Sequence, residues 1–318
     1  MARMSLTKVI ERLLEHDEIL FLCHRYPDGD TIGSAFALCR AVLSLGKRAS
    51  VMCGDILPPK FSYIYEDVEP AELSDHPYIV SVDVADPSLL GVLESDYGHK
   101  IDLCIDHHPT RREFAKESYV DSKAAATAEI IYRIINGLGV ELTKPIALAL
   151  YTAIATDTGC FRYSNVTPAT LRTAAKLMET GIDAYWVNQR MFETKTRARL
   201  QIEREMLESL DFRAGGRVAM MTLSTDMVER AGASEGDIDG IAALPRCIEG
   251  VEAGITFREG ENGYRVSVRT APGVSASDIC RMFGGGGHAA AAGCTLNTSL
   301  DEAKDLILEA FEKVTGEG

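Results

Sequence analysis

IDLCIDHHP, residues 101–109, is the stretch around which this chain is organised. Its apolar, β-favouring run ends in three ionisable side chains and a proline, which is typical of a buried strand that opens into a site at its carboxyl end. In an open parallel sheet, ligands bind beyond the carboxyl ends of the strands. We therefore expect Asp106, His107 and His108 to converge on one ligand. Taken alone, the tripeptide fits a polar turn equally well.

The sequence before this stretch repeats the pattern of a strand followed by polar side chains. Apolar runs predict three earlier strands, at residues 18–23, 49–53 and 78–82. The first ends in the polar loop 24–30, after which a helix is predicted from Ile32, and the third ends in Asp83. Strands and helices that alternate in this way predict an α/β fold with a doubly wound, mostly parallel sheet and right-handed crossovers.

Helical patterns follow, and beyond Asp211 the predicted elements become short strands and helices. The helices are predicted at about residues 124–136, 144–156, 168–180 and 183–210. Shorter elements come next, with strands predicted at 218–223, 251–257 and 264–270. We predict a first domain over residues 1–194, a helical linker over 195–211 and a smaller α/β domain over 212–318.

The composition indicates a globular protein of the cytoplasm. The 318 residues are 46% hydrophobic and 25% charged, and no apolar run reaches the roughly 18 residues of a membrane helix. The N-terminus is predicted to form an amphipathic helix, not a signal core. Eight scattered cysteines without a Cys-x-x-Cys pair favour a reducing compartment and argue against structural zinc.

The net charge of the chain limits the classes of partner that it can bind. A formal net charge of −14 disfavours binding to long nucleic acid, which depends on a basic surface. Residues 212–318 carry 10 Lys and Arg against 16 Asp and Glu, so the second domain is acidic as well. A short phosphorylated substrate remains compatible, because a few arginines and bound metals can neutralise it locally.

Acidic and imidazole side chains at the predicted strand ends form a candidate metal site. The candidate ligands are His24, Asp28, Asp30, Asp83, His107 and Asp157, with His108 beside them. Carboxylates mixed with imidazoles, and no thiolate, suit manganese or magnesium better than structural zinc. The ligands suffice for two ions, which at about 3.5–4 Å apart need a bridging carboxylate, and Asp83 is the natural bridge.

Each acid has a structural alternative when it is considered singly. Asp28 and Asp30 could cap a helix, Asp83 could be a turn residue, and Asp157 could be a C-cap. Their joint position at strand ends favours the metal site.

Taken together, these motifs resemble the DHH phosphoesterase superfamily with its DHHA1 domain, over nearly the whole chain. The matching motifs are His24-x-x-x-Asp28-x-Asp30, Asp83, Asp106-His107-His108, Asp157 and Gly284-Gly285-Gly286-Gly287-His288-x-x-x-Ala292-Gly293. The length, the two-domain layout and Ser267-x-Arg269 resemble the nanoRNase and pAp phosphatase branch, where pAp is 3′-phosphoadenosine 5′-phosphate. Thr270 stands where that branch is expected to have serine, a mild departure.

The resemblance implies two manganese ions, with magnesium or cobalt as substitutes. His24, Asp28 and Asp83 would hold one ion, and Asp30, Asp83, His107 and Asp157 the other. Asp106 would orient a ligating histidine through its second ring nitrogen.

A two-metal site of this kind predicts the chemistry. Two ions that share one water lower its pKa, so that a hydroxide can attack phosphorus in line. His108 would contact the scissile phosphate and protonate the leaving oxygen. The predicted catalytic residues are therefore His108, Asp106 and Asp83.

The glycine run of the second domain is predicted to bind the other end of the substrate. Its N–H groups can approach a phosphate closely, and Arg269 and His288 can add charge-assisted bonds. A glycine run alone is a weak signal, but the family motif supports Arg269, Gly285, Gly286, Gly287 and His288 as substrate-binding residues. We expect the active site in the cleft between the two domains, where a short substrate would fit.

The resemblance implies a hydrolase that cleaves oligoribonucleotides of two to five nucleotides to 5′-mononucleotides, and pAp to AMP. A phosphodiesterase for cyclic di-AMP or pApA is an alternative, and so is a catalytically inactive nucleotide-binding module. The sequence does not rank these substrates, does not fix the direction of degradation, and is compatible with a homodimer without fixing the oligomeric state.

Overall fold

A parallel sheet forms the centre of the N-terminal unit in the computed structural model, which describes residues 2–109, 112–238 and 240–316. The chain divides into two units, Met1–Thr194 and Lys195–Gly318, and each is described by itself. The strands of the first sheet are β1 (Ala2–Arg3), β2 (Glu18–Cys23), β3 (Arg48–Cys53), β4 (Tyr78–Val82), β5 (Leu103–Asp106) and β6 (Glu117–Val120).

The order of these strands determines where a site can form. The sheet runs β1-β6-β5-β4-β2-β3, so β3 lies on one side of β2 while β4, β5 and β6 follow on the other. The strand order therefore reverses at β2. In such sheets ligands bind at the carboxyl ends of the strands next to the reversal, which are here the ends of β2 and β4.

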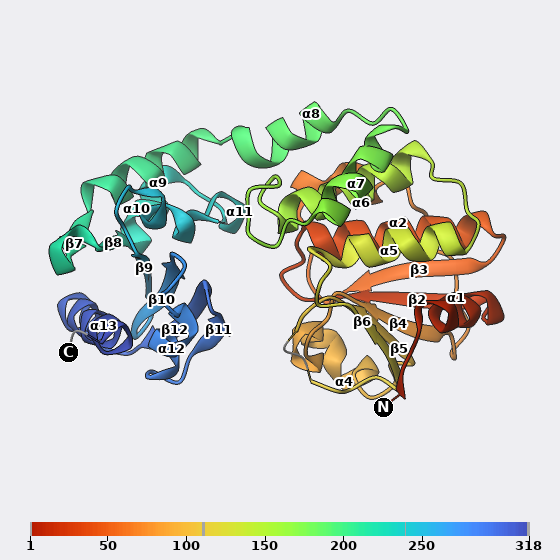
Figure 1. The fold of residues 1–318 in the computed structure, drawn as a ribbon, viewed down its shortest axis with the longest axis horizontal. Helices are drawn as coiled ribbons and strands as arrows, with labels where there is room; N and C mark the ends of the chain where they lie inside the picture. Colours follow the sequence, from red (N-terminus) through yellow and green to blue (C-terminus); the bar gives the residue numbers. More distant parts are fainter. Residues whose placement is uncertain (1, 110–111, 239, 317–318) are drawn as a thin grey trace. The chain divides into compact units, whose positions relative to one another are not determined.

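Helices cover both faces of this sheet (Figure 1). They are α1 (Leu6–Glu15), α2 (Gly29–Ser44), α3 (Ser62–Tyr65), α4 (Glu94–Tyr97), α5 (Thr127–Gly137), α6 (Lys144–Asp157), α7 (Pro168–Met178) and α8 (Ala184–Asn188), with 3-10 turns at Pro59–Phe61 and Pro87–Leu93. Alternate side chains of β2 separate the two cores: Phe21 packs with α2, α5 and α6, while Leu22 packs under the 3-10 turn Pro87–Leu93. The predicted doubly wound α/β fold is confirmed.

Helix α2 begins three residues earlier than the sequence predicted. The Asp28 side chain accepts hydrogen bonds from the backbone N–H groups of Asp30 and Thr31, and this N-cap starts the helix at Gly29. The prediction placed the start at Ile32 because the apolar pattern begins there. Asp30 therefore lies in the first turn of a buried helix and not in a loop.

Helix α6 is the most apolar helix of the site, and other helices cover it. Ala149, Ala153 and Leu150 are fully buried in the core with α2, α5 and α7. At Gly33 of α2 an added Cβ would lie 2.8 Å from the Cβ of Ala153, so only glycine permits this approach of α2 and α6. Within the described ranges, no helix is long and apolar enough to cross a bilayer.

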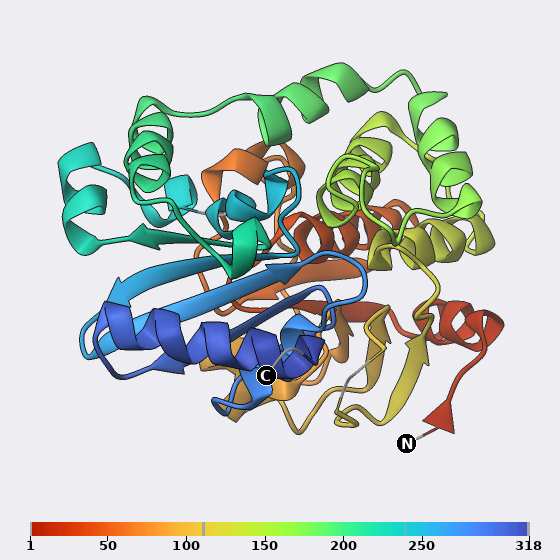
Figure 2. The same cartoon turned by 60° about the vertical axis from the view of Figure 1, so that its left-hand side comes forward.

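The C-terminal unit has a mixed sheet and is the predicted smaller α/β unit. Its elements are α9 (Arg197–Glu208), β7 (Asp211–Arg213), β8 (Val218–Leu223), α10 (Thr225–Ala231), α11 (Glu235–Ile238), β9 (Ala253–Gly260), β10 (Gly263–Thr270), α12 (Ala276–Arg281), β11 (Gly286–His288), β12 (Ala291–Leu296) and α13 (Leu300–Thr315). The sheet order is β11-β12-β10-β9-β8-β7. Among the described strands of this second sheet, β8 and β9 form the one parallel pair. Helix α13 packs over this sheet through Ile307 and Phe311 (Figure 2).

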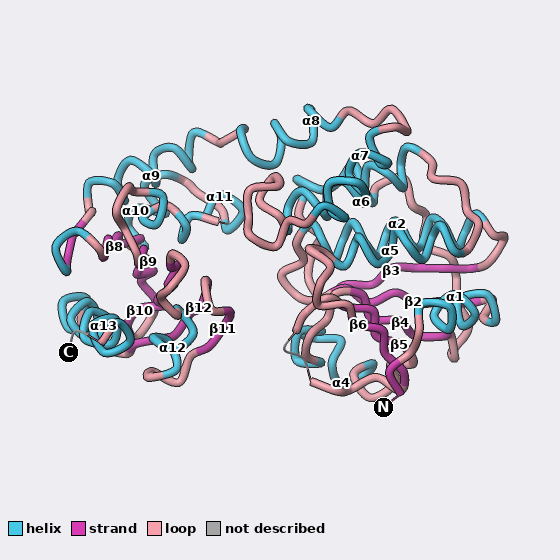
Figure 3. The backbone as a smooth tube through the Cα atoms, viewed as in Figure 1, coloured by secondary structure: helices cyan, strands magenta, loops and turns pink. Residues whose placement is uncertain are grey.

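The predicted helix over 183–210 is interrupted. Helix α8 continues into a π-helical turn at Gln189–Glu193, and α9 begins only at Arg197, as the loop between them in Figure 3 shows. The Thr196 hydroxyl caps α9 by accepting the N–H of Arg199. This break had no glycine or proline to signal it. Strand β6 also escaped prediction, because four residues are too short to show a period of two.

Candidate functional site

Seven side chains gather at the carboxyl end of the N-terminal sheet, as the sequence predicted. They fall into three overlapping groups whose ligand atoms lie within 4.8 Å of one another: His24, Asp28 and Asp83; Asp30, His107 and Asp157; and Asp83, His107 and His108. The loops after β2, β4 and β5 and the ends of α2 and α6 supply them. The described ranges thus bring together every predicted metal ligand.

Asp83 lies between two of these groups. Its Oδ2 is 3.7 Å from Nε2 of His24, and its Oδ1 is 3.7 Å from Nε2 of His107. Its backbone is left-handed, with φ 62°, a conformation that residues other than glycine rarely adopt and that marks functional positions. Each oxygen of one carboxylate therefore faces a different imidazole, which is the arrangement that a bridging ligand requires.

The packing of α2 against α6 brings the acids of these helices together. A Cβ at Gly29 would overlap the side chain of Thr156, so the first turn of α2 contacts the last turn of α6 only because position 29 is glycine. Asp28 and Asp30 flank this glycine, and Asp157 follows the threonine. The close approach of two backbones thus places carboxylates from distant parts of the sequence in one site.

Asp30 is buried and held from several sides. Its Oδ2 accepts the N–H of Thr127 at 2.6 Å, and its Oδ1 accepts the N–H of Ala128 and the hydroxyl of Ser34, both at 3.0 Å. The N-cap residue of α5, Ala126, has no side chain that can cap the helix. Asp30 therefore caps α5 from another helix, and its remaining lone pair on Oδ2 lies 4.0 Å from Nε2 of His107.

The histidine side chains present Nε2 to the carboxylates. Nδ1 of His24 lies 2.7 Å from the Arg25 carbonyl, and Nδ1 of His107 lies 3.1 Å from the Ala124 carbonyl. A carbonyl only accepts, so each Nδ1 carries a proton, and each ring offers the lone pair of Nε2 once it is neutral. This is the tautomer that a metal ligand needs.

Asp106 orients His108, not the predicted ligand His107. Its Oδ1 lies 2.8 Å from Nδ1 of His108 and also accepts the backbone N–H groups of both histidines. The carbonyl of Ala124 orients His107 in the same way, through Nδ1. Among the described side chains, Oδ2 of Asp106 is a buried oxygen without a hydrogen-bond partner.

The pKa values show how strongly the site attracts cations. Burial first, and the neighbouring carboxylates second, raise the pKa of Asp30. Burial and the charges of Asp83 and Asp28 raise the pKa of Asp157 to about 7, although His107 and His108 act in the opposite direction. Burial alone would lower the pKa of His24, but the bond to Asp28 and the nearby charges raise it to about 9. Buried carboxylates whose pKa values are raised, together with imidazoles, are a donor set that fits divalent cations.

The predicted substrate-binding residues lie on neighbouring strands of the C-terminal unit. Arg269 of β10 and His288 of β11 pair with the same residue, Ala291 of β12, from opposite sides. Directly paired residues of antiparallel strands point to the same face. Gly286 and Gly287 precede His288 on the exposed edge strand. One face of this sheet edge thus combines an arginine and a histidine side chain with exposed glycine backbone.

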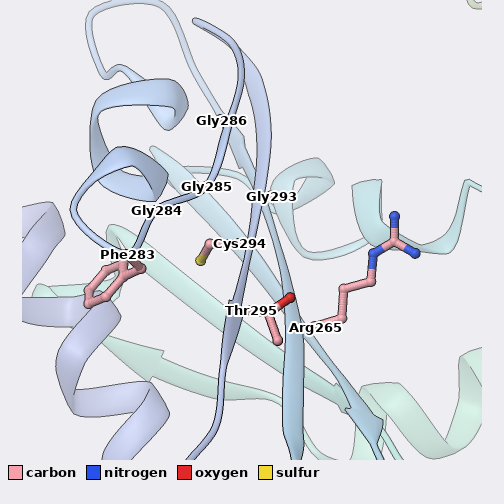
Figure 4. A pocket seen from close by; sticks show the side chains of 8 residues that line it. All are labelled: Arg265, Phe283, Gly284, Gly285, Gly286, Gly293, Cys294 and Thr295. Carbon is pink, nitrogen blue, oxygen red and sulfur yellow. The ribbon is translucent and has the colours of Figure 1, made fainter. Parts of the chain in front are cut away.

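A pocket of about 460 Å³ adjoins the glycine run and adds residues that the sequence analysis missed. It is lined by Arg265, Phe283, Gly284, Gly285, Gly286, Gly293, Cys294 and Thr295. Figure 4 shows Arg265 and Phe283 on opposite sides, with Cys294 and Thr295 between them. The alternation of β10 could have indicated Arg265, because it shares a face with Arg269 four residues later.

Comparisons with known proteins identify the family of this chain. Residues 18–154 match the family described as "DHH family, N-terminal domain", and residues 215–317 match the "DHHA1 domain". A bifunctional oligoribonuclease and PAP phosphatase NrnA of Thermus thermophilus is 37% identical over 94% of this chain and 91% of its own length. The protein of that name from Bacillus subtilis is 25% identical over 98% and 99%. An exopolyphosphatase-related protein of Bacteroides fragilis has the same fold, with a TM-score of 0.89 at 22% identity over 98% of this chain and 96% of its own.

Proposed function

The chain belongs to the DHH family, which confirms the resemblance seen in its motifs, and from this premise we propose that it is a manganese-dependent phosphoesterase. It hydrolyses oligoribonucleotides of two to five nucleotides to 5′-mononucleotides, and pAp to AMP. The names of the Thermus and Bacillus relatives support both activities. Acyclic and cyclic adenine dinucleotides, pApA and cyclic di-AMP, are the alternative substrates.

The position of Asp83 carries this proposal. Its two oxygens face His24 on one side and His107 on the other, so the site can hold two cations with one shared carboxylate. The proposed first set is His24, Asp28 and Asp83, and the proposed second set is Asp30, Asp83, His107 and Asp157. Two bound divalent ions would lower the pKa of a shared water and neutralise the phosphate oxygens.

His108 supplies the proton for the leaving oxygen. Burial would lower its pKa, but the hydrogen bond to Asp106 and the charges of Asp83 and Asp157 raise the pKa to about 9. Nδ1 donates to Asp106, so the proton available to a substrate is on Nε2. Asp106 keeps the ring in this orientation and stabilises its charged form.

The C-terminal unit binds the end of the substrate that is not cleaved. Arg269 provides positive charge and His288 a ring nitrogen donor on one face of the sheet, and the exposed N–H groups of the glycine run can approach a phosphate. The acidic charge of the chain opposes the binding of longer nucleic-acid strands, because each further phosphate adds repulsion.

We propose the reducing cytoplasm as the location of this protein, which its eight free thiols fit.

One experiment tests these proposals together. The protein is incubated with manganese and, separately, pAp, pApA, cyclic di-AMP, RNAs of two to five nucleotides, an RNA of about 24 nucleotides and pyrophosphate, and the products are resolved by chromatography. We expect AMP from pAp and 5′-mononucleotides from the short RNAs. An Asp157→Asn preparation serves as the control for contaminating nucleases.

Two outcomes contradict the proposal. Absence of hydrolysis with manganese, magnesium and cobalt would favour a nucleotide-binding module. Preferential cleavage of the RNA of about 24 nucleotides would overturn the preference for short substrates.

A further inference from the structure

We propose that Thr127 is a positioning residue that fixes the carboxylate of Asp83 so that its two oxygens face two different sets of metal ligands. The inference deepens the proposed function and rests on the metal site in it, but not on any particular substrate. Thr127 is in none of the motifs that identify the family in the sequence. It is the first residue of α5, and it is completely buried.

The first observation is a direct hydrogen bond. The hydroxyl of Thr127 donates to Oδ1 of Asp83 at 2.8 Å, across 44 positions of the sequence. The same Oδ1 lies 3.7 Å from Nε2 of His107. The hydroxyl thus uses one lone pair of this oxygen and leaves the other for a cation beside His107.

The second observation concerns the orientation of the Asp83 carboxylate, which the backbone does not fix. The residue is left-handed, with φ 62°, directly after the last residue of β4, Val82. The torsion about the Cβ–Cγ bond of an aspartate has a broad distribution, so a bond to an oxygen is needed to fix the carboxylate plane. With Oδ1 held by Thr127, Oδ2 points toward His24, 3.7 Å away. The hydroxyl therefore sets the direction of both oxygens.

The third observation is that Thr127 contacts both ligand sets through different atoms. Its backbone N–H donates to Oδ2 of Asp30 at 2.6 Å, while its hydroxyl donates to Asp83. A change of the side chain alone removes the bond to Asp83 and leaves the bond to Asp30. The two contributions can consequently be separated by substitution, which makes the role of the hydroxyl testable.

Thr127→Val removes the hydroxyl and nearly preserves the volume, whereas Thr127→Ser retains the donor. Manganese is titrated into each metal-free protein by calorimetry, and the two-manganese state is followed by electron paramagnetic resonance. We expect wild type and Thr127→Ser to bind two ions and to give the same spin-coupled spectrum. Thr127→Val should bind one ion normally and the second about 10-fold to 100-fold more weakly, with loss of the coupled spectrum.

Thr152→Val is the matched control. Thr152 is a fully buried threonine of the same unit, and its hydroxyl donates to the Leu148 carbonyl and bonds Tyr63, not a proposed ligand. It should retain two ions and the coupled spectrum. The thermal midpoint of each metal-free variant shows whether it is folded, and Thr127→Ala replaces Thr127→Val if the valine does not fit.

Two results would overturn the role of Thr127. One is normal binding of both ions, with an unchanged spectrum, by a folded Thr127→Val or Thr127→Ala. The other is a defect in Thr127→Ser as large as that of the variant without a hydroxyl. Because these readouts need no substrate, they remain decisive even if the wild-type protein hydrolyses none of the proposed substrates, so the two failures can be told apart.

Discussion

Nδ1 of His108 lies 2.8 Å from Oδ1 of Asp106, an oxygen that also accepts the backbone N–H groups of residues 107 and 108. Three donors on one buried oxygen keep the carboxylate charged, and the hydrogen bond to His108 lowers its pKa although burial alone would raise it. The imidazole is therefore held through Nδ1, and Nε2 is the nitrogen that can donate a proton to a substrate. The role of Asp106 in orienting this ring can be tested by substitution.

Asp106→Asn should lower kcat and leave metal binding intact. The neutral amide can still accept the Nδ1 proton, but it no longer stabilises the charged ring. We expect kcat on pAp to fall by about 10-fold to 100-fold with little change in KM. Steady-state kinetics and metal analysis measure both quantities. Asp96→Asn, an exposed change on α4, should behave as wild type, and a loss of manganese from Asp106→Asn would contradict the assignment.

His108→Ala and His107→Ala should have different defects. We expect His108→Ala to keep two manganese ions per chain and to lose about 100-fold or more in turnover, because the proton donor is gone. His107→Ala should lose metal from the second set, since its Nε2 lies 3.5 Å from Asp157. Metal content after gel filtration distinguishes them. Loss of metal and turnover together in His108→Ala would assign His108 to the metal ligands.

Metal affinity should fall as the pH is lowered from 8 to 6. Asp157 and His24 have pKa values of about 7 and about 9 in the metal-free site, so Asp157 gains a proton across this range and His24 holds one throughout it. Cations bind only the deprotonated forms. We expect the Kd for manganese to rise about 10-fold or more over these two pH units. Calorimetry in buffers of different ionisation enthalpy counts the protons released.

The stability of the metal-free protein should change in the opposite direction and fall as the pH rises. Both pKa values are raised above the ordinary ones, so the contribution of Asp157 is complete below about pH 4 and is lost as the pH rises through 7, and that of His24 is lost between about 6.5 and 9. Manganese should therefore raise Tm more at pH 8 than at pH 6. An equal increase at both values would contradict the raised pKa values.

Gly285→Ala and Gly286→Ala should separate folding from substrate binding. A Cβ at Gly285 would lie 2.6 Å from the Cβ of Cys294, whereas a Cβ at Gly286 would meet nothing within 4 Å. We expect Gly285→Ala to lower the unfolding free energy by about 1–3 kcal/mol. Gly286→Ala should keep the wild-type Tm and raise KM for a dinucleotide, because a methyl group would cover the exposed backbone. An unchanged KM would argue against phosphate binding at this run.

The sequence predicted the buried strands best. The predicted bounds of β2, β4 and β8 equal the observed ones, because each is a largely apolar run bounded by polar residues. The start of α2 was missed because the signal there is a cap. Asp28 both caps α2 and lies in a ligand group, so the two interpretations weighed for this residue are compatible.

The site was predictable in its ligands and not in their supports. Aspartates and histidines at predicted strand ends can be recognised as candidate ligands from their residue type alone, and the described structure brings them together. Thr127 was not predictable, because a threonine in the first turn of a helix is ordinary and its partner Asp83 is 44 positions away. The same reason hid the pairing of Asp106 with His108, which depends on the orientation of two rings.

The capping of α5 by Asp30 has a practical consequence for anyone who wants a catalytically silent version of this protein to trap a bound nucleotide. Replacing Asp30 would remove the donor set's deepest carboxylate and simultaneously leave two buried N–H groups at the start of α5 without an acceptor. Such a protein would be compromised in its architecture as well as its chemistry. Asp157, at the accessible end of α6 with a side chain 28% exposed, offers the safer substitution.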